Sequence, residues 1–195
     1  TYYAQLSAPG ALKAAPAAPA PAPVPVAAAA PAASKVDLNE QLSTHFKLVE
    51  FTRSDTAMRK KIDNTPTAEH VQNLKKVCEK ILEPVRNHFG KPVRINSSYR
   101  SPALNAAVGG SGKSQHCNGE AVDFEIDGLP NPELARWVAS NCEFDQCILE
   151  FYDPKEGPNS GWVHASFTSN GVNRKQTLTA VQENGKTVYK PGFLA

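Results

Sequence analysis

Two histidines and one aspartate stand in sequence surroundings that can bring their side chains to one point. His116 and Asp123 lie in the segment Ser114-Gln-His-Cys-Asn-Gly-Glu-Ala-Val-Asp123, and His164 ends the later segment Gly161-Trp-Val-His164. Two imidazoles and one carboxylate form a ligand set that Zn²⁺ accepts, and three protein ligands leave a fourth position for water. Because water held by zinc becomes a nucleophile near neutral pH, the pattern predicts a zinc hydrolase.

The neighbouring sequence indicates which elements hold these three residues. Residues 121–126 alternate between two faces, which predicts a strand whose apolar side chains pack in the core while Asp123 points to the opposite face. Residues 162–167 alternate in the same way and place His164 on a second strand. His116 follows a turn rich in glycine and serine. Two strand residues and one loop residue can therefore form a rigid three-point site.

The motifs resemble a known family of zinc peptidases. The segment from Ser114 to Asp123 reads Ser-x-His-x-x-Gly-x-Ala-x-Asp, and a Trp-x-His segment follows it. Together with Asn96-Ser-Ser-Tyr-Arg-Ser-Pro102, these motifs resemble the D-Ala-D-Ala carboxypeptidase and L-alanyl-D-glutamate endopeptidase family, in its phage-associated branch. The resemblance covers the chain from Val36 to Phe167.

This resemblance implies a ligand, a substrate and further site residues. It implies zinc on the two histidines and the aspartate, and a substrate among peptidoglycan stem peptides. It also implies that Arg100 stabilises the charge developing on the scissile carbonyl, where a fixed guanidinium can contribute several kcal/mol. Ser114 and Trp162 are expected to line the cleft that binds the peptide.

One position departs from the family pattern. Many members carry a general base three residues before the last histidine, and this chain has Gly161 there. We expect Glu150 to take that role, because residues 145–152 look like a buried strand, where an ionised glutamate is unfavourable unless paired or functional. This strand could pair with the strand of His164 in an antiparallel hairpin. If the residue numbers of each pair then add up to an even number, the side chains of Glu150 and His164 share a face. The alternatives are Glu125, Asp153 and Glu156.

An arm rich in alanine and proline precedes the motifs. Its frequent prolines prevent a continuous helix and favour an extended conformation, and they interrupt the apolar run, so we expect no membrane span. We therefore predict an arm or linker over residues 1–35 and a zinc peptidase-like domain over residues 36–195. Such an arm lets an attached enzyme reach the cell wall without diffusing away. We therefore expect the arm to contact phage tail proteins and hold the enzyme in the virion. A lysis enzyme (endolysin) in the host cell lysate, acting on the periplasmic cell wall, is the alternative.

The domain pattern predicts an α+β fold, with a small antiparallel sheet carrying the zinc site and a few helices packed on it. Residues 66–89 have helical spacing, with Thr65 as the expected cap, Pro84 bending the last turn and Gly90 ending the helix. Further elements are expected at 93–96 (strand), 102–108 and 132–140 (helices), and 176–189 (a hairpin around Asn184-Gly185).

Charge and cysteine content exclude several classes of protein. The net charge is only +2, and no nucleic-acid motif is visible, so we expect no nucleic-acid partner. The four cysteines are not spaced like a zinc ribbon or a dense disulfide framework. Cys117 is not expected to be a ligand, because in an extended segment its side chain would point away from that of His116. We expect the four cysteines to be free or only incidentally paired thiols.

Three other functions fit the same residues. A domain that keeps zinc but lacks catalysis would bind the cell wall, and the glycine at position 161 favours it. A structural tail protein would use the arm only for assembly. The same fold could also serve a bacterial enzyme that remodels its own wall.

Overall fold

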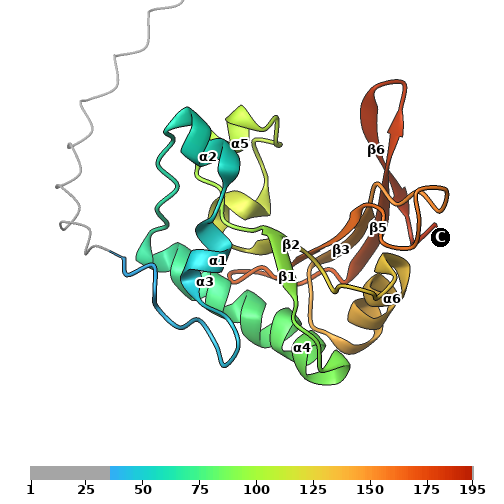
Figure 1. Cartoon of the computed structure of the whole chain (residues 1–195), viewed down its shortest axis with the longest axis horizontal. Coiled ribbons are helices and arrows are strands. Elements are labelled where there is room, and N and C mark those ends of the chain that lie inside the picture. Colours follow the sequence, from blue (N-terminus) through green and yellow to red (C-terminus); the bar gives the residue numbers. More distant parts are fainter. Residues whose placement is uncertain (1–35, 195) are drawn as a thin grey trace, which may run out of the picture. The chain divides into compact units, whose positions relative to one another are not determined.

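The computed structural model describes residues 36–194 (Figure 1). The predicted arm over residues 1–35 lies outside the described residues, so its boundary and its phage-tail contacts stay predictions. Within the described residues, no helix is long and apolar enough to cross a membrane.

Six strands form one sheet in the order β1-β2-β4-β3-β5-β6. Neighbouring strands are antiparallel except β3 and β5, which are parallel. The predicted α+β class is confirmed, but the sheet is mixed rather than purely antiparallel. The chain leaves β4 and joins the far edge of β3, and this crossover makes β5 run in the same direction as β3. The strands are β1 (Arg94–Ser97), β2 (Ala121–Glu125), β3 (Gln146–Glu150), β4 (Trp162–Ser166), β5 (Gln176–Glu183) and β6 (Lys186–Pro191).

Helices cover one face of this sheet. Figure 1 shows α3, α4 and α6 on one side of the strands, with α2 and α5 on the other side near β1. Val122 and Phe124 of β2 are fully buried against the first group, so Asp123 points to the opposite face as predicted. The helices are α1 (Leu48–Thr52), α2 (Asp55–Lys60), α3 (Ala68–Val77), α4 (Glu83–Phe89), α5 (Pro102–Ala107) and α6 (Asn131–Asn141), with a π-helical turn η1 (Cys78–Leu82) and a 3₁₀ turn η2 (Gln115–Asn118).

The long helical segment differs from its prediction at the cap and is interrupted by a π-helical turn. Its cap is Thr67, whose hydroxyl accepts a hydrogen bond from the backbone N–H of His70 at 3.3 Å, whereas Thr65 bonds to Asp63 before the helix. Pro84 lies at the start of α4, directly after η1, so the helix changes from π-helical to α-helical hydrogen bonding at this proline, and the bend predicted there stays a prediction. The π-helical turn accommodates a residue that has no N–H to donate.

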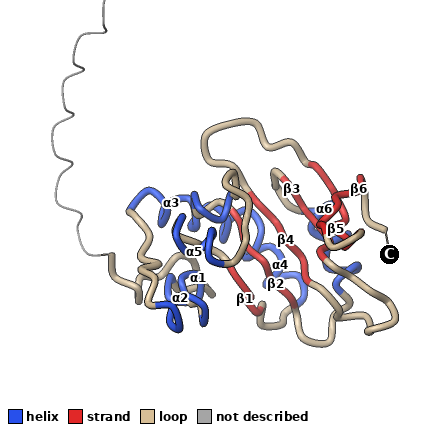
Figure 2. Tube along the Cα trace, turned by 90° about the horizontal axis from the view of Figure 1, so that it is seen from above, coloured by secondary structure: helices blue, strands red, loops and turns tan. Residues whose placement is uncertain are grey.

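The C-terminal hairpin forms as predicted. Its turn residues Asn184 and Gly185 have φ values of 51° and 74°, the pair of positive angles that a two-residue type I′ turn requires. Figure 2 shows β5 and β6 at the edge of the sheet opposite β1. The hairpin therefore extends the sheet face on which Asp123 lies.

Candidate metal centre

The register of the sheet brings the strand-borne residues together on the face opposite the main helices. Asp123 on β2 pairs with His164 on β4. Glu150 on β3 pairs with Trp162, two residues before His164. The numbers of paired residues on β3 and β4 therefore add up to an even number, as a shared face requires. Glu150 and His164 point to the same side of the sheet.

Three donor atoms form a small buried triangle. Nε2 of His116 lies 3.3 Å from Oδ1 of Asp123 and 3.3 Å from Nδ1 of His164, and the last two atoms are 2.8 Å apart. A tetrahedral zinc ion with ligand bonds of about 2.0–2.1 Å separates its ligand atoms by about 3.3–3.4 Å. Two edges of the triangle match this spacing, and the third is the length of a hydrogen bond. The donor set and its spacing therefore fit zinc.

A backbone carbonyl orients His116. This residue lies in η2, and its Nδ1–H donates to the carbonyl oxygen of Ser98 at 2.6 Å. The contact assigns the proton to Nδ1 and leaves the Nε2 lone pair facing Asp123 and His164, as metal-binding histidines require. Ser98 is held in turn by its hydroxyl, which donates to the carbonyl of Ala121 at 2.8 Å. The sequence indicated the Ser-x-Tyr-Arg segment, but not that its backbone orients one of the candidate ligands.

Burial and charge set opposite pKa shifts within the triangle. Burial would raise the pKa of Asp123, but the interactions with His116 and His164 hold it well below its usual range. Burial also opposes a charged His164, yet its hydrogen bond to Asp123 raises the pKa of His164 above the ordinary value. Burial lowers the pKa of His116, so this imidazole favours the neutral form that binds metals.

Arg100 lies at the edge of the triangle. Its Nη2 donates to Oδ2 of Asp123 at 2.8 Å, and its Nε donates to the hydroxyl of Ser97 at 3.0 Å. Two anchors therefore hold the guanidinium beside the donor atoms, where it can stabilise a developing negative charge.

Of the four carboxylates considered as a general base, only Glu150 lines the cleft beside the triangle. Burial raises the pKa of Glu150, while the neighbouring His164 acts in the opposite direction. A carboxyl with a raised pKa is better matched to proton transfer near neutral pH. Glu125 is instead engaged by Arg94, whose Nη2 donates to it at 2.9 Å. Asp153 and Glu156 belong to the β3–β4 connection and do not line the cleft.

The structure explains why glycine stands at position 161. Gly161 has φ of 65°, and a Cβ built there would lie 2.0 Å from the carbonyl oxygen of Glu150. A glutamate therefore does not fit at this position with this backbone. The carboxylate that faces the site comes from the paired strand β3 instead.

A cleft of about 780 Å³ opens over the triangle. Ser114 and Trp162 line it, as does Arg100, so the residues expected to contact a substrate all border the same space. Their roles in binding stay predictions. Cys117 is not part of the triangle; it lies in a 3₁₀ turn rather than in the extended segment that we expected.

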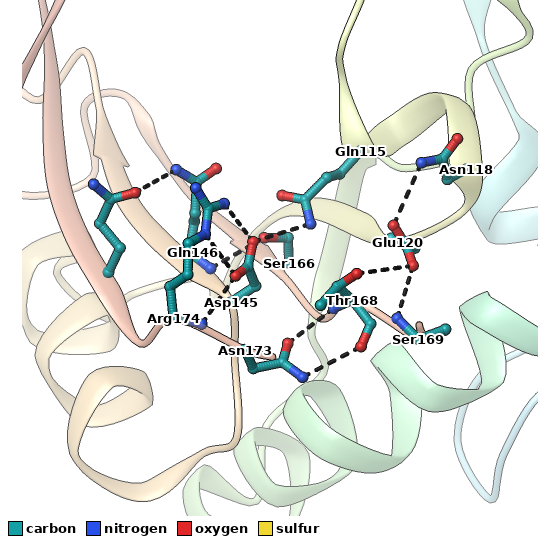
Figure 3. Close-up of polar contacts among 11 residues, drawn as sticks. Gln115, Asn118, Glu120, Asp145, Gln146, Ser166, Thr168, Ser169, Asn173 and Arg174 are labelled. Atoms are coloured by element: carbon teal, nitrogen blue, oxygen red, sulfur yellow. Dashed lines mark hydrogen bonds and ion pairs between the residues drawn. The ribbon is translucent and has the colours of Figure 1, made fainter. Parts of the chain in front are cut away.

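Two buried carboxylates support the turn that carries His116 (Figure 3). Asp145 accepts hydrogen bonds from Gln115 Nε2 at 3.1 Å and from Arg174 Nε at 2.8 Å. Glu120 accepts from Asn118 Nδ2 at 3.4 Å, and also from residues of the β4–β5 connection. Both ends of η2 are thereby tied to residues 167–175. Sequence reasoning missed these supports, because they join segments far apart along the chain.

The sheet and its site define a class of protein. A buried His-Asp-His triangle beside a half-buried glutamate in a cleft is the arrangement expected of a metal-dependent hydrolase. The family model described as Peptidase M15 matches residues 44–154, which is more than half of the 195 residues. The chain belongs to the peptidase M15 family, which supports the predicted metallopeptidase. A comparison with curated proteins found no match.

The family match does not cover the whole site. It ends at residue 154, before His164 and before β4, β5 and β6. The positions of the third donor and of the C-terminal hairpin therefore rest on the structure and not on the family match. The phage-associated branch of the family stays a prediction.

Proposed function

We propose that this protein is a zinc-dependent peptidase that hydrolyses a peptide bond in peptidoglycan stem peptides. The observation that carries the proposal is the donor triangle of His116, Asp123 and His164 with the carboxylate of Glu150 on the same sheet face. When bound, zinc supplies the Lewis acidity that activates water and polarises the scissile carbonyl. The stem-peptide substrate rests on the family resemblance of the motifs.

The protein side chains supply proton transfer, charge stabilisation and substrate positioning. Glu150 accepts a proton from the attacking water and delivers it to the leaving amine, and its raised pKa makes the carboxylate a stronger base for the first transfer. Arg100, held by Ser97 and Asp123, stabilises the negative charge on the carbonyl oxygen. Ser114 and Trp162 border the cleft and position the peptide.

The test compares Glu150→Gln with Glu156→Gln, a matched change at an exposed glutamate outside the cleft. Zinc-loaded proteins are incubated with purified sacculi and with a synthetic stem pentapeptide, and the products are identified by mass spectrometry. General-base catalysis contributes about 10²- to 10⁴-fold, so we expect Glu150→Gln to lose at least about 100-fold in rate while keeping its zinc. The control variant should retain the wild-type rate.

The same experiment separates catalysis from binding. Unchanged hydrolysis by Glu150→Gln would remove this residue from the mechanism. If the zinc-loaded wild type binds sacculi but cleaves neither substrate, the protein is a non-catalytic wall-binding domain. The glycine at position 161 favours this alternative, because many family members carry their general base at that position.

A further inference from the structure

The sheet face that carries the metal centre continues as an apolar surface. The strand register aligns one cross-strand row, in which Asp123 is followed by His164, Ile148, Leu178 and Pro191. Adjacent strands are about 4.8 Å apart, so Leu178 lies about 10 Å from His164. The donor atoms occupy one end of the row and aliphatic side chains occupy the other end.

The apolar end of this row is separate from the main core. Ile148, Leu178 and Ala180 form their own cluster, on the face opposite the helices that cover Val122 and Phe124. Ile148, Leu178 and Pro191 line the same cleft as the metal centre. They provide a floor that a ligand bound at the metal centre can reach.

Tyr189 forms the rim of this apolar region. It pairs with Ala180 across the β5–β6 hairpin, lines the cleft and is 53% exposed. Burial raises the pKa of Tyr189, and the negative charges of Glu150 and Asp123 raise it further. A large side chain that borders the cleft and remains half open to solvent is available to cover a ligand.

The cleft also has a cationic lining residue. Lys113 lies on the connection between α5 and η2, lines the cleft, and makes no ion pair with any residue in 36–194. An apolar floor with one free ammonium at the rim suits a peptide that has an aliphatic side chain and a carboxylate.

We propose that Ile148, Leu178 and Tyr189 form a specificity subsite for a small aliphatic side chain of an extended peptide. At about 3.3 Å per residue, a distance of 10 Å places that side chain about three residues from the scissile bond. The inference rests on the proposed function, because the distance is counted from the catalytic cluster. Leu178 and Tyr189 lie beyond the residues matched by the family, so the match assigns no role to them.

The test uses stem-pentapeptide analogues that carry Gly, Ala or Leu in turn at each position on both sides of the cleaved bond. Wild-type protein should prefer Ala over Gly at one position by about 4- to 10-fold in kcat/KM. Leu178→Ala should enlarge the subsite and shift the preference at that same position towards Leu. Tyr189→Ala should reduce the Ala-to-Gly ratio to about one, because the cover is removed.

Val188→Ala is the matched control, since Val188 neighbours Tyr189 but points to the other face of the hairpin and does not line the cleft. It should leave the Ala-to-Gly ratio unchanged. Zinc content and Tm are measured for every variant, so that a loss of folding is recognised. A shift towards Leu in Leu178→Ala is a gain that a misfolded protein cannot produce.

Binding of the same analogues to the zinc-loaded Glu150→Gln protein, measured by calorimetry, separates the two proposals. Side-chain-dependent binding without hydrolysis by the wild type would overturn the proposed function and support the subsite. Hydrolysis with side-chain ratios that neither Leu178→Ala nor Tyr189→Ala alters would overturn the subsite alone. The absence of both binding and hydrolysis would overturn both.

Discussion

Replacing Asp145 by asparagine tests how strongly the turn that carries His116 is supported. The carboxylate of Asp145 is only 2% exposed, and it accepts hydrogen bonds from Gln115 Nε2 and from the backbone N–H, Nε and Nη2 of Arg174. In Asp145→Asn one oxygen remains an acceptor, but the new amide N–H₂ faces groups that also donate. At least one charge-assisted hydrogen bond is therefore lost.

The expected loss of stability follows from these contacts. A hydrogen bond to a charged group contributes about 1.5–3 kcal/mol. The side chain of Arg174 is 55% exposed, so water compensates part of its lost interaction, and we expect a net decrease of about 2 kcal/mol in the free energy of unfolding. For a chain of this size, that corresponds to a decrease in Tm of about 4–8 °C.

The effect depends on pH in a defined direction. The hydrogen bonds from Arg174 lower the pKa of Asp145 in the folded protein, whereas the unfolded carboxyl has a pKa of about 3.9. The contribution of the carboxylate is thus fully present above about pH 4, and it is lost as the pH falls through the folded pKa. The difference in Tm between wild type and Asp145→Asn should be constant from pH 8 to 5 and shrink in stronger acid.

Calorimetric unfolding of the metal-free proteins measures this difference, with Asp127→Asn as the control. The Asp127 side chain is 88% exposed, so its replacement should change the free energy of unfolding by less than about 0.5 kcal/mol. Because Gln115 adjoins His116, Asp145→Asn should also weaken zinc binding by about 10-fold in chelator competition. Equal Tm values for wild type and Asp145→Asn at pH 7 would refute the reasoning.

Further changes test the metal centre and the β3–β4 turn. His116→Ala and Asp123→Ala should each reduce bound zinc far below one ion per chain in elemental analysis, since two protein ligands remain; Cys117→Ser should leave the zinc content unchanged. Gly161→Ala should lower the free energy of unfolding by more than about 2 kcal/mol in denaturant titration, because the added Cβ meets the Glu150 carbonyl at a positive φ. An unchanged stability of Gly161→Ala would mean that the backbone can move there. A glutamate would then fit at position 161, contrary to our explanation of the glycine.

Local features of the fold could be predicted because neighbouring residues decide them. The alternation around Asp123 placed it opposite Val122 and Phe124, and the structure has them so. The Asn184-Gly185 turn follows from the conformations that these two residues tolerate. The predicted position of the helix cap was wrong by two residues. Thr65 and Thr67 both have the hydroxyl that a cap needs, and only the path of the chain before the helix decides which of them caps it.

The sequence by itself determined which residue types were available for chemistry: two imidazoles, the aspartate between them and a glutamate on an apolar strand. The tertiary structure decided which of these groups meet. The β3–β4 register turns Glu150 to the side of His164, and the same pairing leaves no room for a side chain at position 161. The Ser98 carbonyl orients His116, and the C-terminal hairpin brings its own side chains to the cleft. These contacts join segments far apart in the chain, so they depend on strand order and register, which no local pattern of residues specifies.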